Sequence, residues 1–172
     1  MAKYSAEICI VTFGDKASCI LDFASIENQQ VPEITSGGDT AMGEGVNLAL
    51  DRLEERKQDY RAKGVDYYQP WLVIMSDGVP NGSVIEMERS VSRVTEMVNE
   101  KKLTVFAIGI GNEADKNSLS RLSPRRAPAK LQGINFQEFF EWLSQSVSRT
   151  SQSVLGETVR LDKPPLDGWD IL

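Results

Sequence analysis

Short runs of apolar residues alternate along the chain with longer segments in which apolar residues recur every three or four positions. The clearest run is Trp71–Met75 (WLVIM), which stops at Ser76 and Asp77, before a cluster of turn-forming residues. An apolar run bounded by turn residues is typical of a strand buried on both faces of a parallel sheet. Leu103–Ile110 (LTVFAIGI) has the same character. We therefore expect two buried strands, with Asp77 at the edge where open α/β sheets bind ligands.

The longer segments predict helices. Val46, Leu50 and Leu53 fall at i, i+4 and i+7, which indicates a helix with one face toward the core and a stop signal at Gly64. Ser83–Lys101 repeats the amphipathic pattern, with a predicted apolar stripe of Val84, Val91, Val94 and Val98. The last predicted helix is expected to bury one stripe of apolar residues: Phe136, Phe139, Phe140, Leu143 and Val147.

An antiparallel hairpin is predicted near the N-terminus, from the strands Glu7–Phe13 and Ser18–Phe23 joined by a short loop. If the last residue of the first strand faces the first residue of the second, Cys9 lies opposite Asp22 rather than opposite Cys19. On this register we interpret the two cysteines as separate core thiols and not as a redox pair.

Strands that alternate with helices of ten or more residues indicate an α/β fold with a mostly parallel sheet and helices on both faces. The hairpin adds one antiparallel edge strand. A chain of 172 residues fits one domain. We place that domain at residues 1–150 and expect an extended tail at 151–172, where the composition turns polar and proline-rich.

Composition narrows the function classes. The net charge of −6 argues against a nucleic-acid partner, which would require clustered Lys and Arg. No apolar run reaches the roughly 18 residues of a membrane span. The N-terminus lacks the pattern of a secretory signal, and two cysteines make no disulfide framework, so we expect a cytoplasmic protein. The absence of histidine excludes Ser-His-Asp and Cys-His catalysis within this chain.

Four motifs follow one another at predicted strand–loop junctions. They are TFGD at Thr12–Asp15, SGGDTAMGEGVNLAL at Ser36–Leu50, VIMSDGVPN at Val73–Asn81 and VFAIGIGNEAD at Val105–Asp115. Together they resemble the von Willebrand factor A-type domain, and most closely its bacterial cytoplasmic branch associated with tellurium-resistance loci. The resemblance covers about residues 4 to 150. It implies a three-layer, Rossmann-like fold with a metal-ion-dependent adhesion site at the C-terminal edge of the sheet.

In the family pattern this site takes a threonine from a second loop and an aspartate from a third. Here Thr40 matches the threonine and Asp77 the aspartate, whereas Asp39 is an additional acidic residue that we do not assign to the metal. Each match has a simpler alternative: Thr40 could cap the following helix, and Asp77 could be a turn or helix-capping carboxylate.

The sequence departs from the family pattern at its start. The D-x-S-x-S motif that ends the family's first strand is absent, and we expect the first strand and first helix to be missing. In the family that strand is central, between the strands Glu7–Phe13 and Trp71–Met75, so two apolar strand edges would lack partners. The edges could close on each other, pair with a second copy or accept another polypeptide; we favour association between chains.

The resemblance implies a non-enzymatic module that binds an acidic group of a partner protein through a metal ion. The expected ion is Mg²⁺, or Mn²⁺ or Ca²⁺ in its place. Because Thr40 and Asp77 supply at most two ligands, we expect weak or absent metal binding in this chain. The alternatives are a metal-dependent phosphohydrolase, a nucleotide-binding protein and a scaffold without a site. The sequence lacks the second clustered carboxylate expected of a metal-dependent phosphohydrolase. It also lacks the glycine-rich fingerprint expected of a nucleotide-binding protein.

Overall fold

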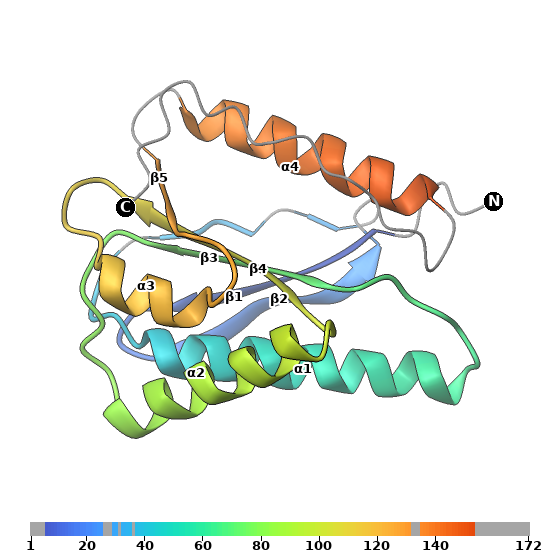
Figure 1. Cartoon of the computed structure of the whole chain (residues 1–172), viewed down its shortest axis with the longest axis horizontal. Coiled ribbons are helices and arrows are strands. Elements are labelled where there is room, and N and C mark those ends of the chain that lie inside the picture. Colours follow the sequence, from blue (N-terminus) through green and yellow to red (C-terminus); the bar gives the residue numbers. More distant parts are fainter. Residues whose placement is uncertain (1–5, 26–28, 31, 36, 132–134, 154–172) are drawn as a thin grey trace. The chain divides into compact units, whose positions relative to one another are not determined.

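The computed structural model describes residues 6–25, 29–30, 32–35, 37–131 and 135–153. In chain order the elements are β1 (Glu7–Phe13), β2 (Ala17–Ser25), α1 (Met42–Ala62), β3 (Trp71–Ser76), α2 (Val84–Asn99), β4 (Thr104–Ile110), α3 (Lys116–Leu122), β5 (Ala129–Leu131) and α4 (Asn135–Gln152). This order confirms the predicted α/β class (Figure 1). Most of the predicted tail at 151–172 lies outside the described residues.

The described residues fall into two compact units. The first comprises Met1–Tyr68, Pro80–Ser90 and Ser151–Glu157, and the second comprises Gln69–Val79, Val91–Thr150 and Thr158–Leu172, in each case as far as these residues are described. The division falls within α2.

The second unit is built on a parallel sheet of β3, β4 and β5. Trp71 pairs with Thr104 at one end of β3, and Ser76 pairs with Gly109 at the other. The residues of β4 are largely buried, as the continuous apolar run predicts. Parallel pairing aligns the carboxyl ends of β3 and β4 at one edge of the sheet.

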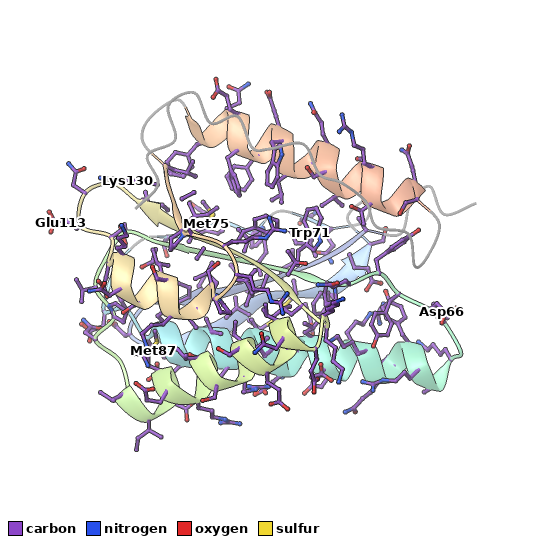
Figure 2. The ribbon with its side chains drawn as sticks, in the orientation of Figure 1. Asp66, Trp71, Met75, Met87, Glu113 and Lys130 are labelled. Carbon is purple, nitrogen blue, oxygen red and sulfur yellow. The ribbon has the colours of Figure 1, made fainter. Side chains whose placement is uncertain are left out.

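Helix α4 covers one face of this sheet, and α3 lies against the other (Figure 1). Ile108 and Leu131 pack with Phe139 and Trp142 of α4. The rings of Trp71, Phe106 and Trp142 form successive edge-to-face contacts, with centroids 5.4 and 5.5 Å apart. Figure 2 labels Trp71 and Met75 on β3, beneath α4.

The predicted stripe of α4 is partly wrong. Phe140 is 49% exposed, whereas Trp142, which is not part of the predicted stripe, is 8% exposed and lies in the core. Phe139, Trp142 and Ser146 follow the i, i+3, i+7 spacing of a single helix face and are all buried, while Phe140 lies about 100° around the helix from Phe139.

The first unit is an antiparallel hairpin of β1 and β2 covered by α1. The close approach depends on Gly45, because a Cβ atom at this position would lie 2.7 Å from Cβ of Phe13. At the other end of β1, Arg56 of α1 forms a bidentate ion pair with Glu7. The Arg56 guanidinium lowers the pKa of Glu7 below its ordinary value.

The start of α2 belongs to the same unit and packs against α1. A Cβ atom on Gly43 would lie 2.5 Å from the backbone nitrogen of Met87, and buried Asn47 donates to the Glu86 carbonyl at 2.9 Å. The predicted stripe of α2 is wrong at its first position: Val84 is 73% exposed and Met87 is buried.

The predicted register of the hairpin is also wrong. Phe13 pairs with Ala17, and Cys19 therefore lies opposite Val11, on the face of the sheet that Cys9 also occupies. Two irregularities in the pairing follow, between residue 8 and residue 11. Diagonal neighbours on one face of an antiparallel pair are within reach of each other. The Sγ atoms of Cys9 and Cys19 lie 3.8 Å apart and both thiols are half-buried, so they are adjacent and not separate core thiols.

One edge of β1 pairs with β2 and one edge of β3 pairs with β4; within the described ranges neither strand has a partner on its second edge. This pairing is consistent with the expected absence of a central strand. A search of the described helices finds none with the length and apolar character needed to cross a bilayer.

Candidate functional site

Asp77 lies at the carboxyl end of β3, as predicted. It directly follows Ser76, the last residue of the strand, and its side chain is exposed. Ser76 Oγ accepts a hydrogen bond from Gly78 N at 3.4 Å, so Ser76 stabilises the turn. Helix α2 begins seven residues further on, where Ser83 Oγ accepts from the backbone N–H of Glu86 at 3.3 Å. Among the described residues the Asp77 carboxylate has no hydrogen-bond or ion-pair partner, so it caps neither turn nor helix.

Thr40 lies two residues before α1. The N-cap of this helix is Ala41, which excludes the capping alternative for the Thr40 side chain. The Thr40 backbone is fixed from both sides: its N–H donates to Asn81 Oδ1 at 2.7 Å, and its carbonyl accepts from Asn81 N at 3.2 Å. The Thr40 hydroxyl has no partner in the part of the chain that the structure describes, and it remains available as a ligand.

The loop before Thr40 is organised by side chains that the sequence analysis did not assign to the site. Asn81 Nδ2 donates to Asp39 Oδ1 at 2.9 Å, and Asp39 N donates to Asp15 Oδ1 at 2.8 Å. Gly38 has φ +84, and a Cβ atom there would lie 2.4 Å from Asp15 Oδ1. Asp15 therefore supports the loop backbone. The only sequence signal for Asn81 is an amide among turn-forming residues.

Glu44, in the first turn of α1, is a further acidic residue in this region. Its Oε1 accepts from Ser83 N at 2.8 Å. Its Oε2 is buried and has no hydrogen-bond partner among the described residues. A buried carboxylate oxygen without a partner is costly and needs explanation. Glu44 follows Thr40 by four residues, and this spacing is the signal that sequence analysis could have used.

The oxygen donors at these loops fit a hard divalent cation. Mg²⁺ takes oxygen ligands in octahedral geometry, retains several waters and needs only one or two carboxylates. Thr40 and Glu44 supply a free hydroxyl and a buried carboxylate oxygen in the first unit, and Asp77 supplies an exposed carboxylate in the second. Since Thr40 and Asp77 belong to different units, their convergence at one ion stays a prediction.

Asp115, in the last of the four motifs, has a structural role. It is the N-cap of α3 and accepts hydrogen bonds from the backbone N–H groups of Asn117 and Ser118, each at 3.2 Å. The Ser118 hydroxyl also donates to it and is the largest cause of its lowered pKa. Asp115 is therefore a helix cap.

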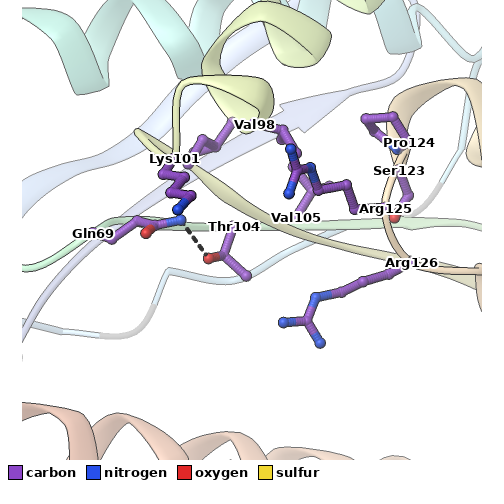
Figure 3. Close-up of a pocket in the computed structure, with 10 residues that line it drawn as sticks. Gln69, Val98, Lys101, Thr104, Val105, Ser123, Pro124, Arg125 and Arg126 are labelled. Atoms are coloured by element: carbon purple, nitrogen blue, oxygen red, sulfur yellow. Dashed lines mark hydrogen bonds between the residues drawn. The ribbon is translucent and has the colours of Figure 1, made fainter. Parts of the chain in front are cut away.

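A pocket of about 270 Å³ lies at the opposite end of β4 from the Asp77 edge (Figure 3). It is lined by cationic side chains of Lys101, Arg125 and Arg126 and crossed by a hydrogen bond of 2.9 Å from Gln69 Nε2 to Thr104 Oγ1. The Arg126 guanidinium stacks 5.0 Å from the centre of the Phe106 ring, which engages it in the second unit's own packing. The pocket is separate from the predicted metal ligands.

The structure is thus an α/β domain with candidate cation ligands: a carboxylate that follows a parallel strand and has no partner among the described residues, and a threonine in the loop before a helix. The sequence matches the von Willebrand factor type A domain family over residues 2–143, and the chain belongs to this family. Domains of this family commonly mediate protein–protein interactions.

Solved structures show a similar fold. Proximal thread matrix protein 1 from the mussel byssus is similar with a TM-score of 0.50 and 20% identity, over 84% of this chain and 35% of that chain. This chain thus spans about a third of that protein. A second structure of the mussel protein, with a zinc-occupied MIDAS motif, has a TM-score of 0.47 at 20% identity, over 69% of this chain and 30% of that chain. An uncharacterised membrane-spanning protein from Vibrio fischeri is similar with a TM-score of 0.33 and 18% identity, over 83% of this chain and 75% of that chain. The comparison with curated proteins gives no match.

Proposed function

We propose that this protein is a non-enzymatic interaction module that binds an acidic group of a partner protein through a divalent cation held by Thr40 and Asp77. The observation that carries the proposal is the exposed Asp77 carboxylate, which follows a parallel strand and has no partner among the described residues. On the motifs quoted above we also assign the chain to the cytoplasmic, tellurium-resistance-associated branch of the family.

The recognition would follow from the ion's charge. A cation that is held by a hydroxyl and few carboxylates keeps most of its positive charge and retains exchangeable waters. An Asp or Glu side chain of a partner can displace one of these waters and neutralise the ion. The partner surface is therefore expected to present an accessible carboxylate.

Glu44 adds a possible third donor to the two predicted from sequence. Its buried Oε2 gains a partner if it contacts the ion directly or through a bound water. Even so, three donors are fewer than the oxygen set of a tight site, and we expect an affinity of about 1 mM or weaker for Mg²⁺ or Ca²⁺.

Calorimetric titration with Mg²⁺ and Mn²⁺ tests the proposal. We expect binding by the wild type, loss of binding in Asp77→Ala and weaker binding in Thr40→Val, which removes the hydroxyl at nearly constant volume. Asp66→Ala is the matched control, because Asp66 is an exposed carboxylate on the loop after α1 (Figure 2). Absence of binding heat in the wild type, or equal heat in Asp77→Ala, contradicts the proposal. Hydrolysis of phosphoesters that is lost in Asp77→Ala would favour the phosphohydrolase instead.

We further propose that the chain associates with a second copy through the unpaired edges of β1 and β3. An exposed strand edge presents backbone N–H and C=O groups that pair readily with another strand. Light scattering on the purified protein should give a mass above that of the 19.1 kDa chain. A concentration-independent monomer would contradict this association, while leaving the metal site untouched.

A further inference from the structure

The corrected register of the hairpin brings together two thiols and a carboxylate. The Sγ atoms of Cys9 and Cys19 lie 3.8 Å apart, and an Asp22 carboxylate oxygen and the two sulfurs all lie within 4.8 Å of one another. We propose that these three side chains form a binding site for a thiophilic divalent cation such as Zn²⁺. This site is separate from the hydroxyl and carboxylate ligands of the proposed adhesion site.

The spacing of the sulfurs matches a tetrahedral zinc ion. Two thiolates that each lie about 2.3 Å from tetrahedral zinc are about 3.8 Å apart. A disulfide would require the same atoms to approach to about 2.05 Å. Cys9 and Cys19 are held on neighbouring strands by the pairing of Val11 with Cys19 and of Ile10 with Leu21. Asp22 Oδ1 accepts a hydrogen bond from Phe23 N at 2.8 Å, and the exposed carboxylate would have to rotate to bind the ion.

The surrounding charge also suits a bound cation. Two thiolates and one carboxylate carry three negative charges, of which Zn²⁺ neutralises two. Arg52 of α1 adds a positive charge beside the site, with its Nη1 3.7 Å from Asp22 Oδ2 and 3.0 Å from Glu55 Oε2, so its charge is shared between the two carboxylates. At many metal sites a neighbouring side chain contacts a ligating carboxylate and holds it in position, and the contact between Arg52 and Asp22 is of this kind.

The number of ligands predicts an exchangeable site. Structural zinc sites have four protein ligands, whereas sites with three keep one position for water or another ligand. Asp22 is exposed and the two cysteines are half-buried, so solvent can reach the fourth position. The site therefore takes up and releases its ion without unfolding of the hairpin.

Binding of each zinc ion is expected to release a fixed number of protons. Free thiols are mostly protonated at neutral pH, and zinc binds thiolates, so each bound ion breaks two S–H bonds and releases two protons to the buffer. Oxidation to a disulfide is the competing use of the pair.

The test is titration of the reduced protein with Co²⁺, which gives thiolate charge-transfer absorption in the ultraviolet and visible bands of tetrahedral cobalt. We expect one thiolate-bound Co²⁺ per chain, displaced by Zn²⁺. Cys9→Ser and Cys19→Ser should each weaken binding by at least about 10-fold. Asp22→Asn should weaken it by a similar factor, whereas Asp66→Asn, a matched change of an exposed carboxylate, should have no effect.

Two further measurements test the hairpin site independently of the cysteine and Asp22 variants. Zn²⁺ should slow alkylation of both cysteines in the wild-type protein, a readout that needs no variant to fold. Asp77→Ala should leave Co²⁺ binding unchanged, so failure of the adhesion site and failure of the hairpin site give different results. Absence of charge-transfer absorption at excess Co²⁺, or unchanged alkylation with excess Zn²⁺, overturns the inference. A disulfide that forms in the presence of Zn²⁺ as readily as in its absence also overturns it.

Discussion

Thr40 and Asn81 are joined by a reciprocal pair of hydrogen bonds. Thr40 N–H donates to Asn81 Oδ1 at 2.7 Å, and Asn81 N–H donates to the Thr40 carbonyl at 3.2 Å. The two residues are separated by 41 positions in the sequence. Asn81 also donates to the Asp39 carboxylate, so one amide side chain fixes the loop that positions the Thr40 hydroxyl.

Asn81→Ala is therefore expected to disorder the Thr40 loop. Loss of the side-chain bonds to Thr40 N–H and to Asp39 should lower the free energy of unfolding by about 1–2 kcal/mol, measured by urea denaturation. It should also weaken Mn²⁺ binding, because the hydroxyl is no longer held in place. Asn99→Ala, at the exposed end of α2, is the control and should leave both quantities unchanged. Equal effects of the two substitutions would show that Asn81 has no special role.

The ion pair between Glu7 and Arg56 predicts a dependence of stability on pH. Arg56 lowers the pKa of Glu7 in the folded state from its ordinary value of 4.5, so the pair stabilises the protein above that value. This contribution is lost as the pH falls through the lowered pKa of the folded state. Glu7→Gln should reduce the free energy of unfolding by about 1 kcal/mol at pH 7, and by much less at pH 3.

The control for this pair is Glu33→Gln, since Glu33 is exposed and has no ion pair among the described residues. It should give the same free energy as the wild type at both pH values. A Glu7→Gln effect that persists undiminished in acid would contradict the electrostatic origin of the stabilisation.

Asp115 predicts a second, local dependence on pH. Asp115→Ala removes the N-cap of α3 and should cost about 1 kcal/mol of unfolding free energy. Because Ser118 lowers the pKa of Asp115 in the folded state, the charged cap stabilises above its ordinary value of 3.8 and loses this effect as the pH falls through the folded-state pKa. Asp115→Asn should match the wild type in acid and be less stable than it at neutral pH. Asp66→Ala should show neither effect.

The predictable part of the fold rests on long apolar patterns. The runs at Trp71–Met75 and Leu103–Ile110 gave two parallel strands in register because continuous apolar segments bounded by turns have few alternative placements. The hairpin register failed because one residue of loop length shifts every cross-strand pair, and the later irregularities cannot be seen in the apolar pattern. Because of this shift, the thiols of Cys9 and Cys19 lie 3.8 Å apart and are not isolated from each other as predicted.

The candidate site was predictable only in its outline. The position of Asp77 follows from the end of the apolar run Trp71–Met75, which hydropathy marks clearly, although most of β3 is half-buried and not buried on both faces as predicted. Asn81 and Glu44 were missed because their roles depend on contacts with residues about 40 positions away. Hydropathy carries no signal for a polar contact of this kind.

We propose that Thr40 and Asp77 bind the same cation, although they belong to different units. The most direct test is to titrate the isotopically labelled protein with Mn²⁺ and follow its amide signals by NMR, because the paramagnetic ion broadens signals from nearby residues. If the ion is shared, the Thr40 and Asp77 signals broaden together at the same Mn²⁺ concentration, and the signals of residues 40 and 77 both stay sharp in Asp77→Ala. Broadening of only one of them, or of Thr40 alone in Asp77→Ala, would contradict a shared site.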